Sequence, residues 1–325
     1  MYDVITVGSN TLDVFAKTDS ELIEIKTKNF TEELLAYPLG SKILIKELDF
    51  MIGGGGTNTA VAFSRLGLKT GYLGKIGKDE NGLKIFKLLK QENIDFLGTL
   101  GGISGYSIIL DSIEEDRTIL AFKGCNNDLT FKELHLQKLQ TKWFYFASMM
   151  GKSLGMMKQL AEYANKNKIK IAFNASTYLA NQGFSNLKKI LENTTVLILN
   201  KEEAEILGGK GSIADMFRRL KLDSMELVII TDGSKGAYAY DGKEMWEVKP
   251  AKKLKIKETT GAGDAFASTF IAARITNKNL KESLKMASIN SESVIQSYGA
   301  KEILLTKNQM IKKLKSDKRI IKKFK

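Results

Sequence analysis

Residues 258–266 combine residue types that suit chemistry on an anion. The segment Thr259-Thr260-Gly261-Ala262-Gly263 precedes an apolar stretch with helical spacing, so small residues would lie at a helix N-terminus. Backbone N–H groups and the positive end of the helix dipole there suit a phosphoryl group. Asp264 would lie in the first turn as a general base facing that pocket. A helix cap, in which the Asp264 carboxylate accepts from first-turn amides, fits the spacing as well.

A run of four glycines at residues 53–56 precedes Thr57 and Asn58. Such a run lets the backbone approach a ligand closely, and the Asn58 amide offers both a donor and an acceptor. A flexible turn capped by Asn58 is the alternative. The run has only the first two glycines of a dinucleotide fingerprint, and no Gly-x4-Gly-Lys-Ser/Thr motif occurs. Neither a standard dinucleotide site nor a P-loop is therefore predicted.

Polar or glycine-rich segments follow three of the expected strands. Asp13 lies beyond the first strand, and residues 200–203 and 231–236 follow two later ones. Each segment alone is typical of an ordinary turn. At the carboxyl ends of strands in one open sheet they would converge on one cleft, where such folds bind ligands.

Short apolar runs alternate with helical patterns along most of the chain. This rhythm predicts an α/β fold with a mostly parallel sheet. The expected strands are residues 4–7, 143–146, 169–173, 196–199 and 227–230, and the expected helices include residues 155–168, 185–192 and 213–221. Asp241-Gly242 predicts a hairpin late in this sheet.

Residues 11–52 and 103–122 show strand alternation without intervening helices. They predict a small antiparallel sheet inserted twice, a lid with one face covered by a ligand or a second copy. Its strands would include residues 21–26, 43–45 and 48–52, with a bulge at Lys46-Glu47. We therefore divide the chain into an α/β domain (1–10, 53–102 and 123–306), this lid, and a basic tail (307–325).

The composition excludes several classes of protein. With 325 residues, 43% hydrophobic and 27% charged, the chain is long and apolar enough to fold around a full core. A single cysteine, Cys125, rules out an intrachain disulfide and a cysteine-rich metal site. The single histidine, His135, lies in an amphipathic-looking segment, which disfavours Ser-His-Asp hydrolases. No apolar run has spanning length and no leader pattern is present, so we expect a cytoplasmic protein.

Much of the net charge of +13 belongs to the end of the chain. Residues 307–325 contain nine cations and one anion, Asp317. Ile311, Leu314, Ile321 and Phe324 lie close to one face of an expected helix there. A protein that binds polyanions or a membrane surface through this end is one hypothesis. A terminal helix packed on the body, or a solvated end, is favoured over it.

Taken together, these segments resemble the ribokinase-like (PfkB) carbohydrate kinases. Residues 53–82 look like the N-terminal signature of that family, and residues 259–264 like its C-terminal signature. The patterns Asn200-x-x-Glu203 and Thr231-x-Gly233-x-x-Gly236 match two further motifs in the expected order. The likeness extends to about residue 305.

The resemblance implies a ribokinase-like sheet flanked by helices with a small β lid, and ATP-dependent phosphorylation of a sugar hydroxyl, with a nucleoside as the alternative acceptor. It implies Asp264 as base and an anion hole of Gly261, Ala262 and Gly263 amides. Asn200 and Glu203 would order Mg²⁺ and its waters. The nucleotide phosphates would contact Thr231, Gly233 and Gly236. The acceptor hydroxyls would contact Asp13, Gly54 and Asn58.

The sequence departs from the family pattern at several positions. Glu258 replaces an aspartate common among relatives, which leaves dependence on a monovalent cation open. Gly55 lies where ribose-specific relatives often have lysine, and residues 147–150 contain no acid. Both features disfavour ribose as the acceptor. Arg117 in the lid is predicted to reach an anionic substrate, with a solvated arginine as the alternative.

The partners expected are a small sugar or nucleoside, with a homodimer through the lid; neither nucleic acid nor a membrane is expected. A binding protein that has lost catalysis is a further hypothesis. The joint presence of Gly261, Gly263 and Asp264 argues against that loss.

Overall fold

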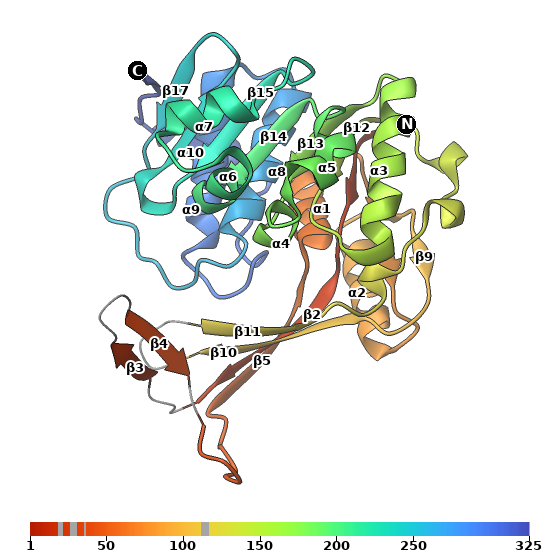
Figure 1. Cartoon of the computed structure of the whole chain (residues 1–325), viewed down its shortest axis with the longest axis vertical. Coiled ribbons are helices and arrows are strands. Elements are labelled where there is room, and N and C mark those ends of the chain that lie inside the picture. The colour runs from red at the N-terminus through yellow and green to blue at the C-terminus, as the bar shows by residue number, and fades with distance from the viewer. Residues whose placement is uncertain (19–21, 27–30, 36, 112–116, 325) are drawn as a thin grey trace.

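The computed structural model describes residues 1–18, 22–26, 31–35, 37–111 and 117–324. Its larger part is a ten-stranded sheet with helices on both faces, and a separate four-stranded sheet extends below it (Figure 1). The strands of the large sheet lie in the order β18-β17-β16-β15-β14-β13-β12-β1-β6-β8. This arrangement confirms the predicted ribokinase-like α/β fold class.

The seven strands from β15 to the β8 edge of the sheet all pair in parallel. On the other side of β15, the strands β16, β17 and β18 continue the sheet with antiparallel pairing. The central strands are apolar and buried on both faces, as a parallel sheet between helix layers requires. All five strands named from the sequence are present, and β16 and β17 form the predicted hairpin. The bounds are β1 (Tyr2–Val7), β6 (Thr70–Leu73), β8 (Asp95–Phe96), β12 (Thr141–Phe146), β13 (Lys170–Asn174), β14 (Val196–Asn200), β15 (Leu227–Thr231), β16 (Ala237–Tyr240), β17 (Met245–Val248) and β18 (Lys322–Phe324).

Two hydrophobic clusters pack on opposite faces of the sheet. One face is covered by α3 (Gly151–Lys166), α5 (Gly183–Leu191), α6 (Lys201–Gly208) and α7 (Ile213–Leu220). The other is covered by α1 (Gly55–Arg65), α8 (Ala262–Ile275), α9 (Leu280–Val294) and α10 (Lys307–Ser316). Helix α2 (Glu80–Gln91) packs with α1 in a third cluster, and α4 (Thr177–Ala180) follows β13. In the described part of the chain no helix is both long and apolar enough to span a membrane.

The four-stranded lid has the order β11-β10-β2-β5. Its bounds are β2 (Thr11–Lys17), β5 (Glu47–Gly53), β10 (Gly105–Asp111) and β11 (Arg117–Phe122). The prediction of a purely antiparallel sheet is wrong, because the neighbours β2 and β10 are parallel. Both strands run outward from the large domain, whereas β5 and β11 return to it. Two short pairs, β3 (Leu22–Lys26) with β4 (Thr31–Leu35) and β7 (Lys75–Ile76) with β9 (Thr99–Leu100), form separate sheets.

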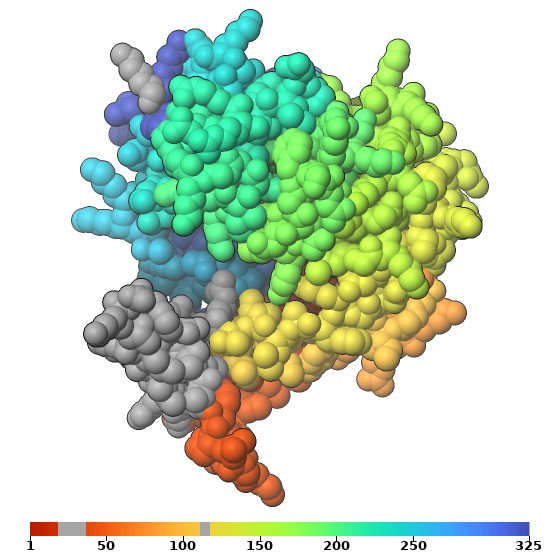
Figure 2. All heavy atoms as spheres, in the orientation of Figure 1, coloured from red at the N-terminus to blue at the C-terminus, as the bar shows by residue number. Residues whose placement is uncertain are grey.

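The strand and bulge expected before residue 47 are not formed. Strand β5 begins at Glu47, and residues 43–45 are exposed in a loop that projects from the molecule (Figure 2). The physical reason is the end of the partner strand: β2 stops at Lys17, whose register partner is Glu47. Strand β3 covers most of the predicted strand at residues 21–26, and residue 21 lies outside the described chain.

The basic end of the chain packs on the large domain. Met310 of α10 is buried, and Leu314 and Ile321 join the cluster under α9. Strand β18 pairs with β17, with Phe324 opposite Met245. The helix stops at Ser316, so the four apolar residues do not share one helical face. Of the alternatives for this segment, the structure shows the packed terminal helix.

Candidate active site

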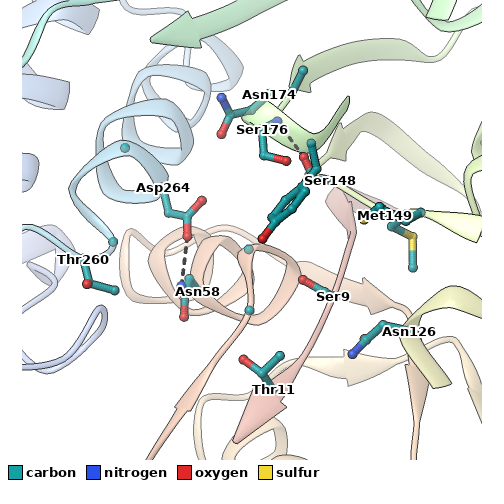
Figure 3. A pocket seen from close by; sticks show the side chains of 18 of the residues that line it. Ser9, Thr11, Asn58, Asn126, Ser148, Met149, Asn174, Ser176, Thr260 and Asp264 are labelled. Atoms are coloured by element: carbon teal, nitrogen blue, oxygen red, sulfur yellow. Dashed lines mark hydrogen bonds between the residues drawn. The ribbon is translucent and has the colours of Figure 1, made fainter. Parts of the chain in front are cut away.

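A cavity of about 430 Å³ lies where the carboxyl ends of the strands meet the lid, and we call it the lid cavity. Figure 3 shows side chains from the lid, α1, the strand ends and α8 converging on it. Nine of the predicted site residues line it, which are Asp13, Gly54, Asn58, Asn200, Glu203, Thr231, Gly261, Gly263 and Asp264. The convergence expected from the strand exits therefore occurs.

A second cavity of about 630 Å³, the loop cavity, lies beside the first. The predicted residues Gly233, Gly236 and Ala262 line it, together with residues of the segment 250–256, polar side chains of α9 and the apolar Ile295 that follows this helix. Asn200, Thr231 and Gly263 line both cavities. The two spaces therefore meet at the N-terminus of α8.

The predicted site residue Arg117 begins β11 opposite Asp111, and its side chain is not among those described.

The start of α8 has the backbone geometry that its glycines predict. Gly261 is the N-cap with φ 80°, in the left-handed region, and a Cβ there would overlap Ala300. Ala262 N–H donates to the Thr259 carbonyl at 3.2 Å. No backbone carbonyl in the described chain accepts from the N–H of Gly263 or Asp264. These two first-turn amides are free to meet a ligand oxygen.

The Asp264 side chain is held on the lid-cavity side of α8. Its Oδ2 accepts from Asn58 Nδ2 at 2.9 Å, as the dashed line in Figure 3 shows. Burial raises the pKa of Asp264 to about 6, against the opposing effects of the Asn58 hydrogen bond and the Lys301 charge. A carboxylate with that pKa is suited to accept a proton near neutral pH.

Lys301 is a site residue that sequence reasoning missed. Its side chain is only 5% exposed, and Nζ donates to the Ile52 carbonyl and, at 2.8 Å, to Asn58 Oδ1. Burial lowers the pKa of Lys301 to about 8, opposed by the carboxylates of Asp13, Glu302 and Asp264. Lys301 lies 243 residues from Asn58 along the chain, so no local pattern links the two.

The four glycines have different roles. Gly54 caps α1 with φ 96°, and a Cβ there would come within 2.6 Å of Asn10 Cα. A Cβ on Gly56 would lie 2.6 Å from the carbonyl carbon of Gly8, so this glycine is needed for packing between two segments. Gly55 faces the cavity, where its nearest contacts would be Ala147 and Asp264. The alternative of a cap by Asn58 is wrong, because the N-cap is Gly54 and no side chain caps the helix, while ligand contact at Gly55 stays a prediction.

Asn200 and Glu203 form a reciprocal cap at the start of α6. Asn200 Oδ1 accepts from Glu203 N–H, and Glu203 Oε2 accepts from Asn200 N–H, both at 2.8 Å. Burial raises the pKa of Glu203 to about 7, against the hydrogen bond from Asn200. Glu203 lines the lid cavity, and the backbone N–H of Thr177 also hydrogen-bonds to its carboxylate. Among the described residues no group of three or more His, Cys, Asp or Glu side chains is placed to enclose a metal ion.

The loop after β15 approaches the neighbouring hairpin closely. Gly236 has φ 103°, and a Cβ there would overlap the Val248 carbonyl, whereas Gly233 has φ 48° and open space around it. Thr231 ends β15 and is paired with Ala237. These residues form a tight backbone turn at the edge of the loop cavity.

Comparison with known proteins adds a family match. The model of the pfkB family carbohydrate kinases matches residues 20–307. An uncharacterised sugar kinase of Archaeoglobus fulgidus is 28% identical over 249 residues, which is 74% of this chain and 97% of the relative. A 5-dehydro-2-deoxygluconokinase of Bacillus subtilis is 24% identical over 281 residues, covering 80% and 85%.

Solved structures share the fold across nearly the whole chain. A nucleoside kinase of Methanocaldococcus jannaschii superposes with a TM-score of 0.78 at 21% identity, covering 97% of this chain and 99% of that one. An Arabidopsis thaliana ribokinase in complex with ribose and ATP gives 0.81 at 18% identity, with the same coverage.

Proposed function

The chain belongs to the pfkB family of carbohydrate kinases, phosphotransferases that act on sugar hydroxyl groups, and from this premise we propose that it transfers the γ-phosphate of ATP to a hydroxyl of a sugar or sugar-like acceptor. We assign the acceptor to the lid cavity and the nucleotide to the loop cavity. The observation that supports this assignment is the position of Gly263 and Asp264, in the first turn of α8 where the two cavities meet.

In this proposal Asp264 acts on the acceptor hydroxyl. Its carboxylate takes the hydroxyl proton as the oxygen attacks phosphorus, and Asn58 holds the carboxylate in place. The anion hole expected from the sequence was Gly261, Ala262 and Gly263, but the Ala262 N–H is bonded to the Thr259 carbonyl. The free N–H groups of Gly263 and Asp264 lie at the helix N-terminus, where negative charge is stabilised. Positioning and charge stabilisation supply most of the rate in phosphoryl transfer, so a site without histidine suits this reaction.

The loop cavity has features that fit a nucleotide. Leu254, Ile256 and Ile295 give it apolar walls suited to a base, while Thr231 and the Gly233–Gly236 turn offer polar backbone near its other end. Bound Mg²⁺ would neutralise the phosphate oxygens. Among the described residues no cluster of acids is placed to enclose an ion, which fits an ion held largely by phosphates and water, as Mg²⁺ commonly is. Asn200 and Glu203 would orient those waters.

The experiment that tests this function is Asp264→Asn. ADP release coupled to an indicator reaction is followed over a panel of pentoses, hexoses, sugar acids, sugar phosphates and nucleosides. We expect wild-type protein to phosphorylate one class and the variant to lose at least about 10³-fold in kcat, since the oxygen that takes the proton is replaced. Asp223→Asn, at an exposed position away from both cavities, is the matched control. Near-normal kcat for Asp264→Asn would refute the assigned base.

Two assignments stay predictions at this stage. A nucleoside is the alternative acceptor, and the same panel separates it from a sugar. The homodimer through the lid is supported by exposed apolar side chains on its strands, with Phe50, Leu120 and Phe122 more than half exposed. Sedimentation at several protein concentrations tests that dimer.

A further inference from the structure

Among the described residues that line the lid cavity, Lys123 has the one cationic side chain. Three carboxylates, Asp13, Glu203 and Asp264, line the same cavity. Each of these acids already has a place in the proposed reaction or in acceptor binding, whereas Lys123 has none. Its position therefore calls for a separate explanation.

The backbone of Lys123 is fixed by neighbouring residues. Lys123 follows β11 and precedes a short 3₁₀ turn, Gly124–Asn127. Its carbonyl accepts from Asn126 Nδ2 at 2.9 Å, and Asn126 is bonded in turn to the backbone of Asn10. The lysine therefore projects from an anchored turn.

The ammonium group of Lys123 lacks an ion-pair partner within the described chain. Its Nζ lies 4.8 Å from the centre of the Tyr178 ring. The side chain is half-buried, and burial lowers the pKa of Lys123, with the charge of Asp13 opposing that effect. Burying an ammonium without a carboxylate partner is unfavourable, and contact with an aromatic face offsets only part of that cost. An anion bound in the cavity would offset much more.

We infer that Lys123 binds an anionic group of the acceptor, a carboxylate or a phosphate, at the end away from the hydroxyl that is phosphorylated. This inference rests on the proposed function for the identity of that hydroxyl. Asn126, which anchors the lysine, and Asp264 lie on opposite sides of the cavity view in Figure 3. Lys123 and Asp264 both line this cavity, so one ligand can contact both.

Of the two anionic groups, a carboxylate is favoured by the name of a similar protein. The Bacillus subtilis relative is named for a sugar acid, 5-dehydro-2-deoxygluconate. The acceptor class assigned here is therefore a sugar acid, and the experiment includes sugar phosphates to separate the two sources of negative charge.

Matched ligands test the inference by direct binding. Titration calorimetry without nucleotide compares five- and six-carbon neutral sugars, their aldonic and keto-aldonic acids, and their terminal phosphates. We expect sugar acids to bind at least about 10-fold more tightly than the matched neutral sugars. Lys123→Met should weaken binding of the acid about 10–100-fold, while Lys123→Arg keeps most of it, since the interaction depends on charge. Phosphates binding in place of acids would keep the role of Lys123 and overturn the assignment of a carboxylate.

Lys281→Met is the matched control, because Lys281 also lies over an aromatic ring, 4.5 Å from the centre of Trp246, and lines neither cavity. Lys123→Gln provides a second variant in case Lys123→Met fails to fold. Tight binding of a neutral sugar that neither variant changes would overturn the inference and leave the kinase function intact. Charge-dependent acid binding without phosphate transfer in the coupled assay would refute the proposed function and support the role of Lys123.

Discussion

The Nζ atom of Lys301 donates to Oδ1 of Asn58 across 2.8 Å, and this bond fixes which way the Asn58 amide faces. An ammonium group has donors only, so the oxygen of the amide must point toward it. The Nδ2 group then points toward Asp264, where it donates at 2.9 Å. Lys301 thus acts on the proposed base through Asn58 as well as through its own charge.

Replacing Lys301 with methionine should weaken the proposed base. The Lys301 charge lowers the pKa of Asp264, so its loss should raise that pKa above about 6. At pH 7 less of the carboxylate is then ionised, and the Asn58 amide is free to turn. We expect kcat to fall about 10- to 100-fold at pH 7, with partial recovery at higher pH. The measurement is the pH profile of kcat and kcat/KM with the best acceptor.

Two comparisons make this result specific. Lys307→Met, at an exposed position in α10, controls for loss of a lysine charge in general. Thermal unfolding separates a positioning role from instability, since a purely structural role would lower Tm without moving the pH profile. An unchanged acid limb in the Lys301→Met profile would contradict the positioning role.

The wild-type activity should depend on the raised pKa of Asp264. Below pH about 6 the carboxyl is protonated and cannot take the hydroxyl proton. We expect log kcat/KM to fall with unit slope below this pH and to level off above it. An acid limb centred near pH 4 would mean that the active carboxylate has an ordinary pKa.

The raised pKa of Asp264 also predicts an effect on stability. Ionisation of this carboxyl favours activity but lowers the stability of the fold. The folded-state pKa of Asp264 lies above the unfolded value of 3.8, so the ionised carboxylate destabilises the fold at high pH, and protonation relieves this as pH falls from about 7 to 4. Asp264→Asn should therefore increase the free energy of unfolding by about 1–3 kcal/mol at pH 8, with the gain disappearing near pH 4. Urea unfolding at both pH values, with Asp223→Asn alongside, measures it. An equal gain in the free energy of unfolding at both pH values would show that the raised pKa of Asp264 is not its cause.

Gly261 and Gly263 form a natural pair for separating folding from catalysis. In Gly261→Ala the new methyl group would overlap Ala300 on a left-handed backbone, so we expect a loss of at least about 2 kcal/mol in stability. A Cβ on Gly263 meets no atom within 4 Å, so Gly263→Ala should fold normally and gain up to about 1 kcal/mol. That methyl lies where the cavities meet, and activity should fall at least about 10-fold. Urea unfolding and the coupled assay give both quantities; full activity of Gly263→Ala would place the reaction elsewhere.

The C-terminal segment should be needed for stability. Arg319, which is 10% exposed, donates to both Glu292 and Asp317 at 2.7 Å. Arg319→Met would leave the largely buried Glu292 carboxylate without its cation and Asp317 with only Lys285, whose Nζ lies 3.5 Å away, and we expect a loss of about 3–5 kcal/mol. Lys318→Met, at the exposed neighbouring position, should change the free energy of unfolding by less than about 0.5 kcal/mol. Equal urea midpoints for the two variants would contradict a structural role for this segment.

Much of the large sheet could be predicted because its strands are buried on both faces. Such strands are continuous apolar runs, and the polar motifs that follow them mark their carboxyl ends. The lid was harder to predict, because strand direction there depends on which neighbours run outward together. The alternation at residues 43–45 pairs with no strand of the described chain, and a pattern in one segment does not reveal that.

The residues that sequence reasoning missed are lysines whose roles depend on distant contacts. Lys301 follows Gly299-Ala300 after α9, a context typical of a surface loop, yet it is buried against residues 52 and 58. Lys123 likewise follows a lid strand with no motif around it. Lysine is normally exposed, so only the folded structure reveals one enclosed near a carboxylate.

Residues shared by the two cavities have a consequence for inhibitor design. Asn200, Thr231 and Gly263 border both spaces, and at Gly263 no side chain separates them. A single compound with a nucleotide-like group at one end and an acidic sugar mimic at the other would fit across this junction. Joining the two groups removes the entropic cost of a second association, so such a bisubstrate compound should bind far more tightly than either half.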